Sequence, residues 1–362
     1  RLGVELNIPE AAQTGLAILE AEAERLLLPS GLLREGSSHY QFLYLRNYAD
    51  VWLCARRHAR PETGRLEAIT RRLAAAARVL VLPGGVPLVG DISPDSPPEY
   101  LAGLMPGNPR QGWLAGLEPA EAEAMETLLA GTAPADPAHV AADGFLRLDR
   151  AGWSCLMRAE PDGWTFYPGH GHQDMGSFEL HYGPVRVIVD AGRGRYGESG
   201  ESAFYRSAAA HNGLTLGTLD PYPVNKPYFD DRFRRDVAGS PPQVEWSPDH
   251  AAIAFAGYAR FGVTTMSRAL RLEPNRVIID DHAQGRGHHT LTRRFHTPLE
   301  VEVGAEEVIL GRRFRLSAPG GTATIEPRTL WSAYGRGQPG HVVTIHADAA
   351  LPWQGRIVIE VI

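Results

Sequence analysis

The chain has 362 residues, of which 43% are hydrophobic and 22% charged, a globular composition that excludes collagen-like, intrinsically disordered and disulfide-scaffold classes. Its length predicts two or three domains. The formal charge of -6 gives no overall attraction to nucleic acid or to an anionic membrane, and no apolar run approaches the roughly 20 residues of a membrane span. We therefore expect neither a nucleic-acid partner nor a membrane span.

The first part of the chain is predicted to be helical, because apolar side chains recur there every three or four residues. Such stretches cover residues 11–28, 38–57, 64–79 and 118–129. Ser37 or Ser38 is a suitable N-cap for the second of them. The Pro/Gly-rich residues 82–98 predict a long ordered loop or a lid, and residues 131–137 predict a linker.

After about residue 142 the hydrophobic period changes from 3.6 to 2. Short alternating runs follow one another without intervening helices, which indicates antiparallel sheets rather than a parallel α/β sheet. The runs cover residues 145–149, 153–158, 177–182, 185–190, 251–255, 265–271, 276–280, 290–296, 301–303, 322–325 and 356–360. The predicted fold class is α+β, with a helical part followed by a large antiparallel β-sandwich. Cys54 and Cys155 fall in different parts, so no disulfide framework is expected.

The densest group of potential metal ligands is His170-Gly-His172-Gln-Asp174, followed by Asp190 and His211. If residues 170–174 form a strand, its two histidines and its aspartate share one face, because side chains alternate along a strand. Imidazoles and a carboxylate suit Zn²⁺ in a tetrahedral site. A lone histidine is more often an ordinary surface or core residue, but the whole set favours a metal site.

The same His-x-His-x-Asp string also suggests a metallo-β-lactamase-like hydrolase. That motif continues with a further histidine, whereas Met175 stands at the next position here. The αβ/βα layering of that fold is not predicted either. We therefore rank a metallo-β-lactamase-like fold below the alternatives.

A second group, Glu35-Gly-Ser-Ser-His39-Tyr40, lies at the start of the second predicted helix. A tyrosine held near a cation can act as a general acid or, when ionised, as a general base, provided that its pKa is lowered from about 10. The same residues also fit a helix cap followed by packing aromatics. Taken alone, the segment favours this structural interpretation.

Together, these separated motifs resemble the heparinase II/III-like polysaccharide lyases. The helical Glu35-x-Ser37-x-x-Tyr40 resembles the segment that contains the catalytic tyrosine of that family. The other matching segments are Gly90-Asp91 and residues 170–174, 177–180, 189–192, Tyr196, 205–207 and 210–212. The resemblance covers about residues 31–296, and it is specific because several motifs occur in the family's order.

The resemblance implies that residues 1–138 are the C-terminal part of an incomplete (α/α) toroid and that residues 139–362 form an antiparallel β-sheet domain. It implies β-elimination on an acidic, uronate-containing glycan such as an exopolysaccharide, in a groove between the two. Such a substrate implies a periplasmic or secreted protein. The oligomeric state cannot be read from the sequence.

The resemblance also implies roles for individual residues. Tyr40 transfers a proton, His170 neutralises the substrate carboxylate or serves as an alternative base, and Tyr196 belongs to the same catalytic cluster. The implied substrate-binding residues are Glu35, His39 and Arg206, of which the arginine offers a bidentate donor. The residues that match the family's structural Zn²⁺ site are His172, Asp190 and His211.

One departure from the family pattern bears on activity. Members carry an Asn or His well before the tyrosine, where it pairs with the substrate carboxylate, and only 39 residues precede Tyr40 here. Either that group belongs to an N-terminal portion outside this sequence or His39 replaces it. Two alternatives therefore stay open beside the lyase, namely a non-catalytic glycan-binding or assembly protein of the same fold and a zinc-dependent hydrolase.

Overall fold

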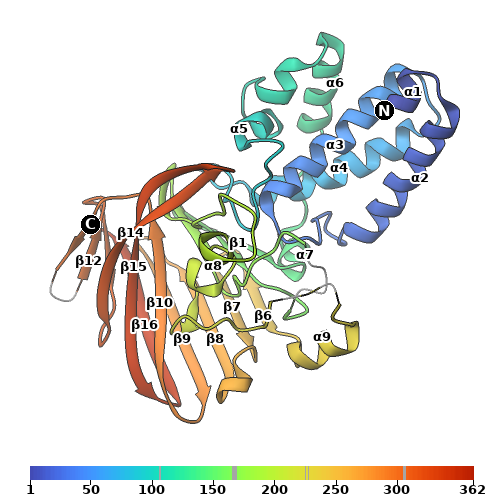
Figure 1. Ribbon diagram of the computed structural model, residues 1–362. Helices are drawn as coiled ribbons and strands as arrows, with labels where there is room; N and C mark the ends of the chain where they lie inside the picture. The colour runs from blue at the N-terminus through green and yellow to red at the C-terminus, as the bar shows by residue number, and fades with distance from the viewer. Residues whose placement is uncertain (106, 165–168, 225, 227, 305–306) are drawn as a thin grey trace.

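The computed structural model describes residues 1–105, 107–164, 169–224, 226, 228–304 and 307–362. Helices occupy the first part of the chain and strands the second, as the change of hydrophobic period predicts (Figure 1). The helices of the first part are α1 (Leu2–Glu5), α2 (Pro9–Leu26), α3 (Ser38–Arg57), α4 (Thr63–Leu80), α5 (Pro98–Leu101), α6 (Pro119–Ala130) and α7 (Pro137–Ala142), with 3-10 turns at Ala102–Leu104 and Gly112–Gly116. None of the helices described is long and apolar enough to cross a membrane.

Helices α3 and α4 lie side by side and form the centre of the helical part (Figure 1). Ser37 caps α3, since its Oγ accepts a hydrogen bond from the Tyr40 backbone N–H at 3.2 Å. One face of the two helices is buried, and its large side chains are Phe42, Leu45, Tyr48, Trp52, Leu53, Leu66, Ile69 and Leu73. This burial fixes the first turn of α3, which carries the candidate catalytic tyrosine.

The described strands form three sheets, in which every neighbouring pair is antiparallel. The first sheet holds β1 (Phe145–Arg150), β2 (Trp153–Arg158), β3 (Phe178–Tyr182) and β4 (Val185–Ile188). The second has the order β14 (Thr322–Ala333), β15 (Arg336–Ala350), β10 (His288–Thr297), β5 (Leu214–Leu216). The third has the order β11 (Val301–Val303), β12 (Glu307–Leu310), β13 (Phe314–Ser317), β16 (Trp353–Val361), β9 (Arg276–Gly285), β8 (Val263–Leu272), β7 (His250–Phe255), β6 (Gln243–Ser247). Two short helices, α8 (Gly200–Phe204) and α9 (Asp231–Ala238), lie in the connections, and 3-10 turns occur at Ala208–Ala210 and Ala259–Phe261.

The helical part and the first sheet share a continuous hydrophobic contact. The buried side chains that form it come from the loop before α3, from α4 and the loop after it, from α7 and from the first two strands, and they include Leu32, Leu80, Leu82, Val89, Val140, Phe145 and Leu156. Arg147 on β1 donates to the carbonyls of Val79 and Val81 at the end of α4. The Pro/Gly-rich loop 82–98 is ordered, because Ser38 at the start of α3 donates to the Val89 carbonyl and accepts from its N–H.

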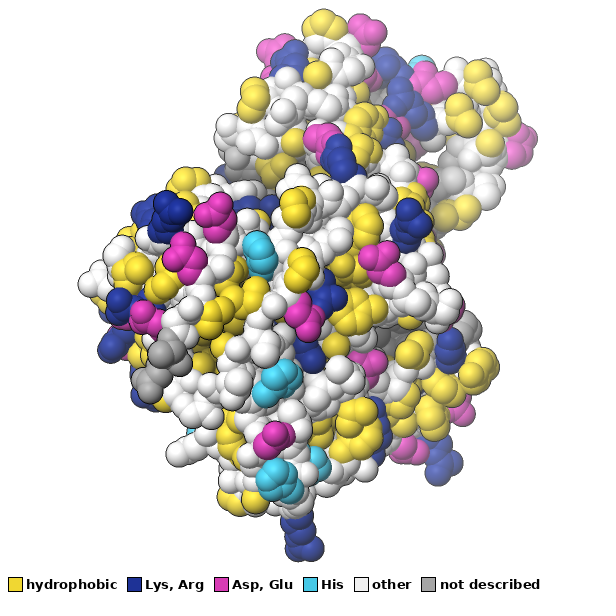
Figure 2. Space-filling model, turned by 60° about the vertical axis from the view of Figure 1, so that its left-hand side comes forward, with side chains coloured by type: hydrophobic (Ala, Val, Ile, Leu, Met, Phe, Trp, Pro, Cys, Tyr) yellow, Lys and Arg dark blue, Asp and Glu magenta, His cyan; other side chains and the backbone are white. Residues whose placement is uncertain are grey.

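The long hairpin of β14 and β15 curves toward the helices at its upper end, where it is drawn in red in Figure 1. At this end Arg336 pairs with Glu99 of α5, with 2.5 Å between Nη2 and Oε1. The sheets and the helices are therefore linked by charge at the hairpin as well as by the buried contact at β1. Acidic and basic side chains are interspersed over the face shown in Figure 2, in keeping with the small net charge.

The segment of residues 170–174 departs from its prediction, because it forms a loop rather than a strand. Its backbone bonds to other loops, since the His170 N–H donates to the Glu35 carbonyl at 3.1 Å and the His170 carbonyl accepts from the Asp91 N–H at 2.8 Å. The prediction that alternation brings His170, His172 and Asp174 onto one strand face was therefore wrong. Cys54 and Cys155 are buried and unpaired, as expected.

Candidate functional site

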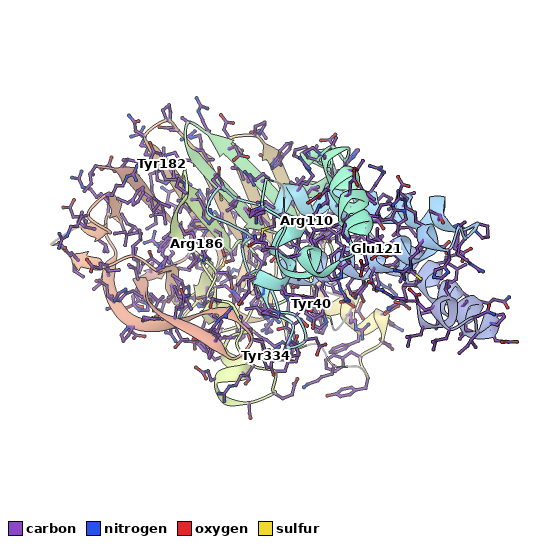
Figure 3. All side chains as sticks on the ribbon, turned by 90° about the horizontal axis from the view of Figure 1, so that it is seen from above. Tyr40, Arg110, Glu121, Tyr182, Arg186 and Tyr334 are labelled. Atoms are coloured by element: carbon purple, nitrogen blue, oxygen red, sulfur yellow. The ribbon has the colours of Figure 1, made fainter. Side chains whose placement is uncertain are left out.

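Tyr40 lies where the helices meet the sheets (Figure 3). Its ring stacks on the His170 imidazole, with 3.6 Å between the ring centroids and 11° between the planes. Its hydroxyl lies 2.7 Å from the Tyr196 hydroxyl. The three residues implied as catalytic by the family resemblance thus form one cluster, contributed by the first turn of α3 and by two loops of the sheet part.

Asp91 orients His170. Its Oδ2 lies 3.2 Å from Nδ1 of His170, so the carboxylate favours the tautomer with the proton on Nδ1. Nε2 of the same ring then keeps a free lone pair, and the nearest carboxylate oxygen to it is Oε2 of Glu35 at 3.6 Å. A neutral histidine held in this way can accept a proton at Nε2.

Asp91 also bonds to His172 and to Arg193, at 2.9 Å from Nε2 and 2.8 Å from Nη1. Burial would raise the pKa of Asp91, but the hydrogen bonds from His170 and His172 and the Arg193 charge hold that pKa well below its usual range. Asp91 is therefore a permanent anion. The sequence analysis placed Asp91 in a long loop and in a segment that resembles the family, but it gave no signal that the Asp91 carboxylate would join both histidines.

Gly90 allows this arrangement. It has a φ of +76°, and a Cβ built there would lie 2.7 Å from the His170 carbonyl oxygen and 2.8 Å from that of Gly36. Only glycine tolerates both the left-handed backbone and this approach. The Gly90-Asp91 pair thus brings the carboxylate against the histidine loop.

Tyr196 is held in its protonated form. Partial burial, the hydrogen bond with Tyr40 and the nearby Asp91 charge all raise the pKa of Tyr196. Its hydroxyl donates to the Ile92 carbonyl at 3.2 Å, so it accepts from the Tyr40 hydroxyl. In this pair Tyr40 is the proton donor, and Tyr196 holds it in place.

The turn between β14 and β15 supports the Tyr196 loop, a contact that the sequence analysis missed. The Tyr334 ring meets that of Tyr196 edge-on with 5.2 Å between centroids, and the Tyr334 hydroxyl accepts from the Tyr196 N–H at 3.3 Å (Figure 3). The backbone N–H of Trp331 donates to the Ala191 carbonyl at 2.8 Å. A Cβ on Gly194 would lie 2.1 Å from the Trp331 ring, so the loop and the turn are in close contact.

The three residues predicted to hold zinc lie in one buried region. His211 pairs with Asp190 through Nδ1 and Oδ2 at 2.7 Å, and the His172 ring centroid lies 5.1 Å from that of His211. Burial disfavours the charged forms of both His211 and Asp190, but their pairing raises the pKa of His211 and lowers that of Asp190. Nδ1 of His172 and Nε2 of His211 are buried without a hydrogen-bond partner.

These donor types and unpartnered nitrogens suit Zn²⁺, but the three ligand atoms do not converge on one point. His172 directs Nε2 at Asp91 instead. Within the described residues, the one group of three potential ligand atoms that lie within 4.8 Å of one another is Glu5, Cys54 and His58, on the far side of the helical part. Asp174, which the predicted strand placed with the histidines, lies near Arg158, at 3.9 Å between Oδ1 and Nε.

The predicted substrate-binding residues fall in three different places. Glu35 faces His170 in the cluster. His39 is buried behind Tyr40, and burial lowers its pKa to about 4 although a backbone hydrogen bond at Ser96 opposes the shift. Arg206 pairs with Glu198, and its backbone carbonyl accepts from the Gln173 N–H of the 170–174 loop at 3.0 Å.

The fold and its motifs match known proteins. A family model described as Heparinase II/III-like, C-terminal, matches residues 132–354, and no curated protein matches the chain. Heparan sulfate lyase HepC from Pedobacter heparinus superposes with a TM-score of 0.65 at 15% identity, over 98% of this chain and 56% of that one. A heparinase III, the BT4657 gene product, gives a TM-score of 0.69 at 15% identity with the same coverage. This likeness shows the fold, and the chain spans about half the length of these structures.

Proposed function

Because the chain belongs to the family with a heparinase II/III-like C-terminal domain, we propose that it is part of a polysaccharide lyase that cleaves a uronate-containing glycan by β-elimination. One observation carries the proposal. A tyrosine that can give a proton is stacked on a histidine whose Nδ1 is held by a permanent carboxylate. The proposed acid, Tyr40, and the proposed base, His170, are therefore in direct contact.

In the proposed reaction Nε2 of His170 takes the proton from C5 of the uronate. The electron pair forms the C4=C5 double bond as the C4–O bond breaks, and the Tyr40 hydroxyl protonates the departing oxygen. Asp91 stabilises the imidazolium that forms. Where the C5 proton faces the tyrosine instead, the ionised Tyr40 takes that proton and passes it to the departing oxygen, and His170 faces the carboxylate.

The architecture supports a cleft at the junction of the two parts. We propose that residues 1–138 are the end of an (α/α) toroid and that residues 139–362 are the sheet domain, with Tyr40 on one wall and His170 on the other. One solved structure with this fold is described as a heparan sulfate lyase, which supports an acidic glycan as the substrate. From such a substrate we infer a periplasmic or secreted protein.

We further infer a structural role for Zn²⁺, held by His172, Asp190 and His211. The two buried imidazole nitrogens without partners support it, and binding requires the side chains to turn until the three ligand atoms meet at one point. When bound, the ion would hold together the loops that carry these residues. No step of the elimination requires it.

An ultraviolet absorbance assay for the new C4=C5 double bond tests the proposal. It should be run on heparan sulfate, chondroitin, hyaluronan, alginate and bacterial exopolysaccharides. Rising absorbance on any of them is the expected result. New reducing ends without absorbance would indicate a zinc-dependent hydrolase, and glycan binding without either product would indicate a binding or assembly protein.

A further inference from the structure

A group of three potential metal ligands lies at the end of the helical part that is remote from the sheets (Figure 1). Cys54 lies in the last turn of α3, His58 is the C-cap of that helix, and Glu5 ends α1. One ligand atom of each residue lies within 4.8 Å of those of the other two. Since a helix rises 1.5 Å per residue, His58 is about 27 Å along α3 from Tyr40. The group is therefore separate from the proposed catalytic cluster.

The packing of three helices brings these side chains together. Residues four apart lie on the same helix face, and the last turn of α3 is closed, because the His58 N–H donates to the Cys54 carbonyl at 3.2 Å. Glu5 reaches this face because α1 packs closely on α2, where a Cβ on Gly3 would lie 2.3 Å from the Ala12 backbone nitrogen. Oε2 of Glu5 lies 3.2 Å from Nε2 of His58. The fold thus holds a sulfur, a nitrogen and an oxygen donor side by side.

This combination of donors suits zinc. Thiolate, imidazole and carboxylate groups bind Zn²⁺ at about 2.3, 2.0–2.1 and 2.0–2.2 Å, so a tetrahedral site places neighbouring ligand atoms roughly 3.3–3.7 Å apart. The separation between Glu5 and His58 is already close to this spacing. The limit of 4.8 Å on the other two pairs leaves about 1 Å to close, which small side-chain rotations supply.

An ion can reach the group from solvent. The side chains of Glu5 and His58 are 27% and 37% exposed, and His58 lines a surface cavity of about 300 Å³. Cys54 is buried beneath them and forms the floor of the group. Because Zn²⁺ binds the thiolate, binding breaks the S–H bond of Cys54, forms the S–Zn bond and releases the proton to solvent. Three protein ligands leave the fourth position to water.

Two arginines pair with Glu5, but each also has another carboxylate partner. Arg57 and Arg1 both contact Oε1 of Glu5, and Nε of Arg1 lies at 3.7 Å from it. Arg57 also pairs with Glu121, at 2.7 Å between Nη1 and Oε1, and Arg1 also pairs with Asp50. Glu5 can therefore turn toward a metal ion while both arginines keep an anionic partner.

We propose that Glu5, Cys54 and His58 form a Zn²⁺ site that fastens α1 to the end of α3. Helix α1 has four residues, too few for a stable helix without tertiary contacts. A metal ion would join it to α3 by coordinate bonds in addition to the ion pairs of Glu5. The site is distinct from the buried group of His172, Asp190 and His211, which contains no sulfur.

The sulfur allows a direct test. Co²⁺ accepts the same types of ligand as Zn²⁺, and a thiolate bound to Co²⁺ gives a charge-transfer band in the near ultraviolet. The reduced 362-residue chain is titrated with Co²⁺, and the account predicts this band, followed by its loss when Zn²⁺ displaces the cobalt. Co²⁺ at the buried histidine group cannot produce the band. Its absence at saturating Co²⁺ would overturn the proposal.

Variants assign the band to its ligands. Cys54→Ala should abolish it, whereas the matched Cys155→Ala, which removes the other thiol of the chain, should keep it. His58→Gln should weaken Co²⁺ binding by roughly a hundredfold or more, because even the loss of a ligand's hydrogen-bond partner costs about tenfold to a hundredfold. If Cys54→Ala does not fold, His58→Gln still decides. A band that survives Cys54→Ala, or unchanged affinity in His58→Gln, would contradict the assignment.

Hydrogen exchange tests whether the ion fastens α1. At a Zn²⁺ concentration of about ten times Kd, amide exchange in α1 should slow roughly tenfold in the unmodified chain and should not slow in Cys54→Ala. Unchanged exchange in the unmodified chain would overturn the fastening role. Neither measurement involves turnover, so failure of this proposal and failure of the lyase proposal are distinguishable.

Discussion

The Tyr40 cluster and the buried group of His172, Asp190 and His211 contain similar side chains but differ in their surroundings. Tyr40 and His170 are only partly buried, and their contacts leave a phenol proton and an imidazole nitrogen available. The side chains of the second group are at most 2% exposed, and each is already paired, His211 with Asp190 and His172 with Asp91. The first arrangement suits proton transfer, and the second suits holding loops in place.

Asp91 connects the two groups, because one of its oxygens bonds to His170 and the other to His172. A carboxylate shared in this way couples the orientation of the exposed histidine to the buried region. The comparison therefore predicts that changes in the Tyr40 cluster alter rate with little loss of stability, whereas changes in the buried group alter stability first.

The largest expected effect is on rate. Tyr40→Phe removes the proposed proton donor and should lower the rate of elimination by roughly a thousandfold or more. The free energy of unfolding should change by about 1 kcal/mol or less, since the lost hydrogen bond is exposed. Tyr44→Phe, one turn further along α3, is the matched control and should retain its activity. An unchanged rate for Tyr40→Phe would remove Tyr40 from the mechanism.

In the buried group, His211→Ala leaves the Asp190 carboxylate without its cation. We expect the free energy of unfolding to fall by about 3–5 kcal/mol and the zinc content to drop. Urea unfolding and metal analysis measure both. His288→Ala, at an exposed histidine of β10, is the control. Normal zinc content and stability in His211→Ala would contradict the assigned structural role.

His39, the buried histidine behind Tyr40, is expected to make the free energy of unfolding depend on pH. Because the folded pKa of His39 is about 4 and the unfolded value about 6.5, the unfolded chain binds a proton that the folded chain does not in this window. Stability should therefore fall, by about 3 kcal/mol from this residue, as the pH drops from about 6.5 to about 4. His39→Gln should flatten the slope measured by urea unfolding, whereas the exposed His288→Gln should not. An identical slope in His39→Gln would show that the residue is not held neutral.

The smallest expected effect concerns the support of Tyr196. Tyr334→Phe keeps the ring contact but removes the acceptor of the Tyr196 N–H, so we expect roughly a threefold lower kcat with KM unchanged. Tyr228→Phe, at a tyrosine that is 78% exposed, is the control. A loss in Tyr334→Phe as large as that in Tyr40→Phe would indicate a direct role in the chemistry.

Local patterns predicted many strands and the long helices α2, α3, α4 and α6, whereas the short helices α1, α5, α7, α8 and α9 were missed. The predicted helix over residues 38–57 has the bounds of α3, because its serine cap and its apolar face are both local signals. Strand β15 was missed, since Gly337, Pro339 and Gly340 interrupt its alternation and only pairing with β14 and β10 makes it a strand. Strands β5, β6, β12 and β13 were missed as well.

Local sequence patterns predicted less of the candidate site than of the fold. Family motifs named Tyr40, His170 and Tyr196, but spacing alone could not show that they meet. The bond between Asp91 and His170 spans 79 positions of the chain, and the support from Tyr334 spans 138. Contacts between residues so far apart in the sequence follow from the tertiary fold. The fold places the 82–98 loop against the loop of His170 and the β14–β15 turn against the loop of Tyr196.

The central claim is that the Tyr40 cluster cleaves a glycan by elimination rather than by hydrolysis. Digestion in water labelled with heavy oxygen, followed by mass spectrometry of the fragments, tests it most directly. Elimination breaks the C4–O bond without adding water, so the account predicts unsaturated fragments that carry no label. Saturated fragments with one labelled oxygen at each new reducing end would contradict it.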